Sequence, residues 1–196
     1  MNNKMFFTIV LNFIVGVSYM LSAQLQADVK RMAVSLDDQV LEIKKEISGG
    51  GTFDLIDGTT ERVDGICSFD KDRLKTGRSF FFDRISIGYA SNADSGKEGE
   101  LEYNTKAPVA LQNALFIISQ DGREVLRMPM RDVHSIHTGE KNADDYSELD
   151  SLRYLVDERE IKVQIKFPGN VALPAATKHY VYVRLKGLQT TKKTSA

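Results

Sequence analysis

Apolar and polar residues alternate in short runs over most of the chain from Thr52 to Leu188. The run IKVQIKF, from Ile161 to Phe167, has an apolar residue at every second position. Successive side chains of a β-strand point to opposite faces of the sheet, so this run predicts a strand with one buried and one solvated face. The pattern therefore predicts a chain that is mainly β.

A β-hairpin is predicted in ALFIISQDGREVLRMPM, from Ala114 to Met130, where two apolar runs meet. Asp121 and Gly122 lie between the runs, and Asp-Gly supplies the positive φ angles that a two-residue type I′ turn requires. After the turn, Leu126 and Met128 lie on one face and Arg127 on the other.

Other strands are predicted on both sides of this hairpin, separated by turn signals that contain Gly, Asn, Asp or Pro. They are TFDLI from Thr52, RVDGICSF from Arg62, RSFFFDRISIGYA from Arg78, GELEYN from Gly99 and HYVYVRLKGL from His179. About seven short strands with turn-rich connections predict an antiparallel β-sandwich, jelly-roll-like in class. We expect it to span residues 52–190, with a polar tail at 191–196. The strand order stays open, because a jelly roll and an immunoglobulin-like sandwich need similar numbers of strands.

One helix is predicted between the strands, in NADDYSELDSLRYLV from Asn142. Asp144 or Asp145 is its expected N-cap. Its inner face is expected to consist of Tyr146, Leu149 and Leu152.

The amino-terminal segment, residues 1–23, differs from the rest because Met5 to Leu21 is almost wholly apolar and carries no charge. Three interpretations stay open. The segment can be a secretory signal that is cleaved after Ala23. It can be a retained membrane anchor, since a span needs about 17–25 residues. It can also be an arm that is buried against other protein.

An amphipathic helix is predicted over residues 24–48, because apolar residues recur there at steps of three and four. The stripe consists of Leu25, Val29, Met32, Leu36, Val40, Ile43 and Ile47. It either packs on the protein's own domain or forms an assembly interface with other copies of the chain. Gly49, Gly50 and Gly51 are expected to end the helix and to act as a hinge before the β-sandwich.

Composition and charge exclude some classes of function. The 196 residues carry a formal net charge of −1, which gives no global electrostatic reason to bind nucleic acid. One cysteine, Cys67, and three histidines cannot supply the usual ligand sets of a structural zinc site.

Candidate chemistry is sparse. Asp132, His134 and His137 lie close together in RDVHSIH and are the best candidates for a metal site or acid–base catalysis. A polar loop accounts for the same residues, since no recognised metal or nucleophile motif accompanies them. His179 opens a predicted strand, and Cys67 lies among apolar neighbours as a buried small side chain would. We therefore expect no enzyme activity and no cofactor.

The strand sequences GRSFFFDRISIGYA, APVALQNALFIISQDGREVLRMPM and HYVYVRLKGLQT resemble those of jelly-roll capsid proteins of tailless bacterial viruses. The resemblance covers about residues 78–189. It implies a virion structural subunit whose partners are other copies of itself and other virion proteins, with lipid contact through residues 5–21 if the virion contains a membrane. The alternative is an exported or membrane-anchored β-sandwich of a bacterial envelope that binds a ligand. An envelope enzyme that uses Asp132, His134 and His137 is a third candidate.

Overall fold

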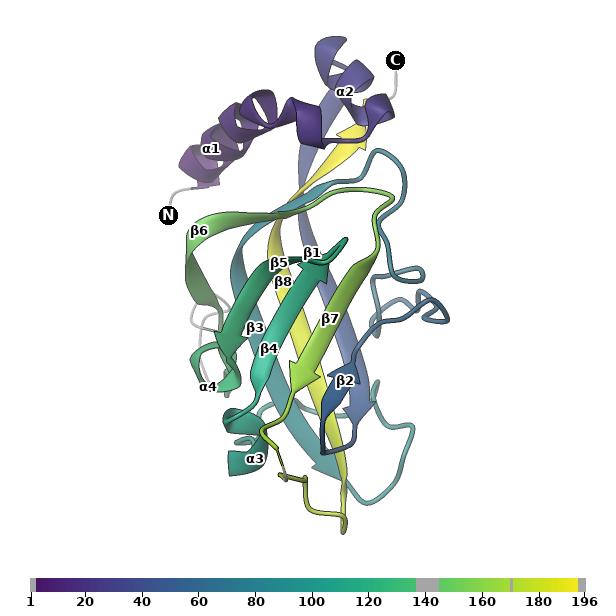
Figure 1. Cartoon of the computed structure of the whole chain (residues 1–196), viewed down its shortest axis with the longest axis vertical. Helices are drawn as coiled ribbons and strands as arrows, with labels where there is room; N and C mark the ends of the chain where they lie inside the picture. The colour runs from purple at the N-terminus through teal and green to yellow at the C-terminus, as the bar shows by residue number, and fades with distance from the viewer. Residues whose placement is uncertain (1–2, 137–144, 170, 194–196) are drawn as a thin grey trace.

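Two four-stranded antiparallel sheets form the protein in a computed structural model that describes residues 3–136, 145–169 and 171–193 (Figure 1). One sheet contains, in spatial order, β1 (Val34–Ile47), β8 (Lys178–Lys192), β3 (Phe80–Asn92) and β6 (Ser147–Leu155). The other contains β2 (Thr52–Asp54), β7 (Ile161–Lys166), β4 (Leu115–Gln120) and β5 (Arg123–Pro129). Helices are short and lie at the ends of the strands.

The strand order is that of a jelly roll. β4 pairs with β5, β3 with β6, β2 with β7 and β1 with β8, so the chain forms nested antiparallel pairs around one hairpin. The β3–β8 and β4–β7 pairings then join these pairs into two sheets. Eight strands in this double Greek-key order define the jelly roll. The predicted jelly-roll-like β-sandwich is thus confirmed.

The runs of alternating apolar and polar residues form strands in which one face is buried and the other is more exposed. On β7, Ile161, Val163 and Ile165 are fully buried between the sheets, whereas Lys162 and Lys166 are exposed. The β4–β5 hairpin turns at Asp121 and Gly122, whose φ angles of 48° and 77° are those of the predicted type I′ turn.

The predicted helix over residues 24–48 is wrong beyond its first turns. α2 ends at Lys30, the chain turns at Met32 with a φ of 55°, and β1 then pairs with β8 along its whole length. The apolar residues of β1 occur on both faces, because its inner face packs in the core and part of its outer face packs under the N-terminal helices. Leu36 on one face and Ile43 on the other together imitate a helical spacing.

The predicted hinge is also wrong. Residues 49–51 connect β1 to β2, so they form a loop that crosses from one sheet to the other within the folded domain. The backbone of Gly49 packs so closely that a Cβ there would lie 2.1 Å from the nitrogen of Leu173. The carbonyl of Gly51 accepts a hydrogen bond from Phe167. Since β1 belongs to a sheet, the β-sandwich begins at Val34 instead of residue 52.

The predicted helix from Asn142 is a strand where the structure describes it, because Ser147 to Leu155 form β6. Residues 137–144 lie outside the described part of the chain. Leu152 packs under the N-terminal helices and Leu149 packs against the core between the sheets, so apolar side chains on both faces again imitate a helix. The predicted strands from Arg62 and Gly99 are loops with isolated bridges at Val63–Cys67 and Tyr89–Asn104.

A β-bulge in β3 makes one glycine essential. The register of β3 shifts between Phe82 and Arg84, and Gly187 of β8 lies opposite this shift. A Cβ on Gly187 would lie 1.9 Å from the carbonyl oxygen of Phe81 and 2.7 Å from the Cα of Phe82. Both obstacles are backbone atoms, which cannot move without breaking the pairing.

We expect Gly187→Ala to lower the free energy of unfolding by about 1–3 kcal/mol or more, because the added methyl group overlaps the backbone of β3. Urea unfolding measures this change. Gly58→Ala is the matched control, since a Cβ there meets no atom within 4 Å and Gly58 has no positive φ. Equal effects of the two substitutions would contradict the proposed crowding at the bulge.

Candidate assembly surface

Three helices form a cap over one end of the sandwich, where β8 ends (Figure 1). They are α1 (Asn3–Gly16), the 3-10 helix η1 (Ser18–Met20) and α2 (Ala23–Lys30). The cap packs on the outer face of the β1-β8-β3-β6 sheet, the face turned away from the core between the sheets. This face would otherwise expose several large apolar side chains.

An apolar cluster joins the cap to the sheet. Its buried members are Phe6, Val10, Ile14, Leu21, Leu25, Phe81, Tyr154, Val156 and Leu188. Phe81 of β3 is fully buried at its centre, and the ring of Phe13 lies 6.2 Å from that of Phe81 and 5.2 Å from that of Tyr154. Burial of aromatic and aliphatic side chains on this scale fixes the cap as part of the folded domain.

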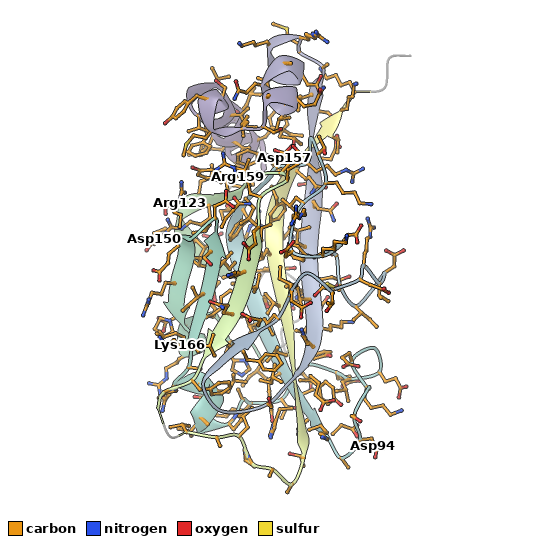
Figure 2. All side chains as sticks on the ribbon, turned by 45° about the vertical axis from the view of Figure 1, so that its right-hand side comes forward. Asp94, Arg123, Asp150, Asp157, Arg159 and Lys166 are labelled. Atoms are coloured by element: carbon orange, nitrogen blue, oxygen red, sulfur yellow. The ribbon has the colours of Figure 1, made fainter. Side chains whose placement is uncertain are left out.

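A buried carboxylate adds a polar connection between cap and sheet. Asp157 follows β6 and lies directly beneath the helices (Figure 2). It accepts hydrogen bonds from the hydroxyl of Ser22 at 2.7 Å and the backbone N–H of Gly77 at 2.6 Å. Ser22 is also the N-cap of α2, and its oxygen accepts a hydrogen bond from Leu25. One hydroxyl therefore orients α2 and ties it to the sandwich.

The opposite face of α1 is exposed and mostly apolar, with Thr8 and Asn12 as polar residues among its exposed side chains. The exposed large apolar side chains of the cap's first two helices are Met5, Phe7, Ile9, Leu11, Val15 and Tyr19. Val15 retains 66% of its accessible surface. A helix that is apolar all round is usually covered on all sides, and a contiguous exposed apolar patch marks an interaction surface. Among the described residues, no helix has both the length and the hydropathy that crossing a membrane would require.

The predicted interface stripe does not form one surface. Leu25 is buried in the cap cluster, and Val29 and Leu36 pack against that cluster. Ile43 and Ile47 belong to the core between the sheets, and Val40 is half-buried on the outer face of β1. Met32 alone of the seven is largely exposed, at 81%. The exposed apolar surface lies instead in the segment from Met5 to Leu21, which the sequence marks by its lack of charge.

The candidate metal residues are arranged differently from a metal site. His134 uses both ring nitrogens for the backbone: Nδ1 donates to the carbonyl of Ile87 at 3.0 Å, and Nε2 accepts from the N–H of Ala107 at 3.1 Å. Asp132 is exposed on α4 (Met130–Val133), and His137 lies outside the described residues. Within those residues, no three His, Cys, Asp or Glu side chains come together to hold a metal ion.

His179 and Cys67, the other potentially reactive side chains, have structural roles. The imidazole of His179 lies between the hydroxyl of Tyr89 at 2.6 Å and the carbonyl of Pro174 at 2.8 Å. Cys67 is buried, and this burial raises the pKa of its thiol. A raised pKa keeps the thiol protonated and unreactive at neutral pH.

Neither a protein-family model nor a curated protein matches this chain. Its function therefore has to be argued from the jelly-roll fold and from the surface of the cap.

We expect Ile14→Ala to lower the free energy of unfolding by about 2–5 kcal/mol, because Ile14 is buried in the cap cluster. Leu11→Ala on the exposed side of the same helix is the control, with an expected change within about 0.5 kcal/mol. Urea unfolding of the full chain compares them. No difference between the two variants would mean that the helix does not pack on the sheet.

His134 makes stability depend on pH. Burial lowers its pKa below the ordinary value of 6.5, so the unfolded chain binds the proton more tightly than the folded one. Stability from this group is fully present above the unfolded-state pKa of about 6.5 and is lost as the pH falls from there through the lower pKa of the folded state. Protonation would also place a donor at Nε2 against the N–H of Ala107.

Urea unfolding at pH 7.5, 6.5 and 5.5 tests this prediction with His134→Gln as the reference. The wild type should lose more stability than the variant on acidification, because only the wild type takes up this proton. Parallel curves for the two proteins would show that His134 does not cause the pH dependence.

Proposed function

We propose that the protein is a jelly-roll structural subunit of a virion, and that it assembles with copies of itself through the exposed face of α1. The observation that carries this proposal is a helix fixed on the sheet by one apolar face while its other apolar face stays open to solvent. The strand order supports it, because jelly rolls are recurrent in viral capsid domains as well as in lectins and cupins.

A second copy of the chain fits this face chemically. From Met5 to Tyr19, the cap has no charged side chain that would repel an identical surface. An isologous contact, in which the same patch meets itself about a two-fold axis, would bury both apolar faces at once. The cap cluster holds α1 on the sheet and Asp157 holds α2 through Ser22, so little ordering of the cap is needed on association.

The rival is an exported or membrane-anchored β-sandwich that binds a ligand at a bacterial envelope. Cleavage after Ala23 would cut at the first residue of α2 and separate Ser22 from Asp157. It would also remove the side chains that cover Phe81 and Leu188 on the sheet. The fit between the segment and the sheet supports retention of the segment, and with it the assembly proposal.

Sedimentation velocity of the full chain over a range of concentrations tests the assembly. We expect the wild type to form a defined oligomer and the triple variant Phe7→Gln, Leu11→Gln, Val15→Gln to be monomeric, with unfolding free energy changed by less than about 1 kcal/mol per site. Val109→Gln is the control: Val109 is 68% exposed on α3 (Val109–Gln112), at the opposite end of the sandwich (Figure 1).

A wild type that stays monomeric at high concentration would overturn the assembly proposal. Material from the native source that begins at Gln24 would instead favour the exported protein. A control variant that dissociates as readily as the triple variant would show that the contact is not made by α1.

A further inference from the structure

A small cationic hollow lies between β1 and the long loop that joins β2 to β3. Figure 1 shows this loop beside β1. Its volume is about 80 Å³. Leu41 of β1, Leu74 of the loop and Gln189 of β8 are buried residues that line it. It lies apart from the exposed face of α1, and neither the fold nor the proposed assembly accounts for its chemistry.

Positive charge dominates this hollow. The charged side chains that line it are Arg62, Arg73, Lys75, Arg78 and Asp70. Arg62 and Arg73 each form an exposed ion pair with a neighbouring aspartate outside the lining. Lys75 and Arg78 have no ion-pair partner within the part of the chain that the structure describes. Two cations are thus available to a ligand, against one exposed carboxylate at the rim.

Hydrogen-bond donors accompany these cations. Gln189 is only 6% exposed as a residue, and its side-chain amide makes no hydrogen bond within the described residues, but its amide atoms are not among the fully buried unpartnered ones. Ser68 accepts a hydrogen bond from the N–H of Glu42 at 3.1 Å, which leaves its own hydroxyl hydrogen to donate. An amide that lines a cationic hollow and makes no hydrogen bond within the protein is available to donate one to a bound anion.

We propose that this hollow binds one tetrahedral oxyanion, a phosphate or sulfate group. Lys75 and Arg78 supply the charge, and the Gln189 amide and the Ser68 hydroxyl donate hydrogen bonds to the anion oxygens. The volume is sufficient for a single group of this kind. The inference is independent of the proposed function, since it uses neither α1 nor any contact between subunits.

Isothermal titration calorimetry of the full chain with inorganic phosphate, at constant ionic strength in sodium chloride, tests this proposal. We expect saturable binding that the double variant Lys75→Gln, Arg78→Gln weakens at least 10-fold. Lys166→Gln is the matched control, because Lys166 is an exposed lysine of β7 on the other sheet (Figure 2). It should bind phosphate as the wild type does.

Gln189→Met separates binding from stability. The variant removes an unpartnered amide at nearly constant volume, so the melting temperature should be unchanged or higher while phosphate affinity falls at least 3-fold. Parallel titrations with sulfate and methyl phosphate identify the source: tight binding of methyl phosphate indicates a phosphate carried on a larger molecule, whereas preference for phosphate or sulfate indicates a free ion.

Absence of saturable binding of any of the three anions would overturn the proposal. So would an equal loss of affinity in the Lys166→Gln control, because the attraction would then be a general effect of surface charge. A Gln189→Met variant with a lower melting temperature and unchanged affinity would show that the amide serves the fold.

Discussion

The burial of Phe81 on the outer face of the β1-β8-β3-β6 sheet is the contact on which the rest of the structure depends. Its neighbours Phe80 and Phe82 point into the core between the sheets, so Phe81 must point outward. An outward phenylalanine at the centre of a four-stranded sheet needs a cover, and α1, η1 and α2 supply it. The cap therefore belongs to the jelly roll as a third layer at one end, and the exposed apolar side chains of α1 are the consequence of using a largely apolar helix for that layer.

The same contact explains which elements the sequence predicts correctly. β7 and the β4–β5 hairpin have one buried and one more open face, so their alternation is clear and their predicted positions are confirmed. β1 and β6 run beneath the cap and carry apolar side chains on both faces, as Leu36 and Ile43 show on β1. Apolar residues on the two faces of one strand together approximate the spacing of a helix. The local pattern cannot distinguish the two cases, because the outer face is buried only by the cap, which comes from another part of the chain.

The sequence also reveals the two candidate sites, the exposed face of α1 and the cationic hollow, to different degrees. The charge-free run from Met5 to Leu21 is evident in the sequence, but which side chains it leaves exposed depends on the direction in which α1 meets Phe81. The cationic hollow has no sequence signature, since Arg78 and Gln189 come from the loop before β3 and from the last strand. Their proximity follows from β1–β8 pairing and from the jelly-roll order, which composition and periodicity do not determine.

The cap and the hollow are physically connected through Arg78. Arg78 lies between Gly77, whose N–H donates to Asp157, and Ser79, whose N–H donates to the hydroxyl of Thr190 on β8. Asp157 also accepts the hydroxyl of Ser22, the N-cap of α2. The backbone on both sides of the cation is thus held by Asp157, which also binds Ser22 of the cap, and by Thr190 of the last strand. A buried carboxylate that loses one of its donors is left poorly satisfied. The geometry of the hollow therefore depends on a cap that stays attached to the sheet, so the two surfaces belong to one folded unit.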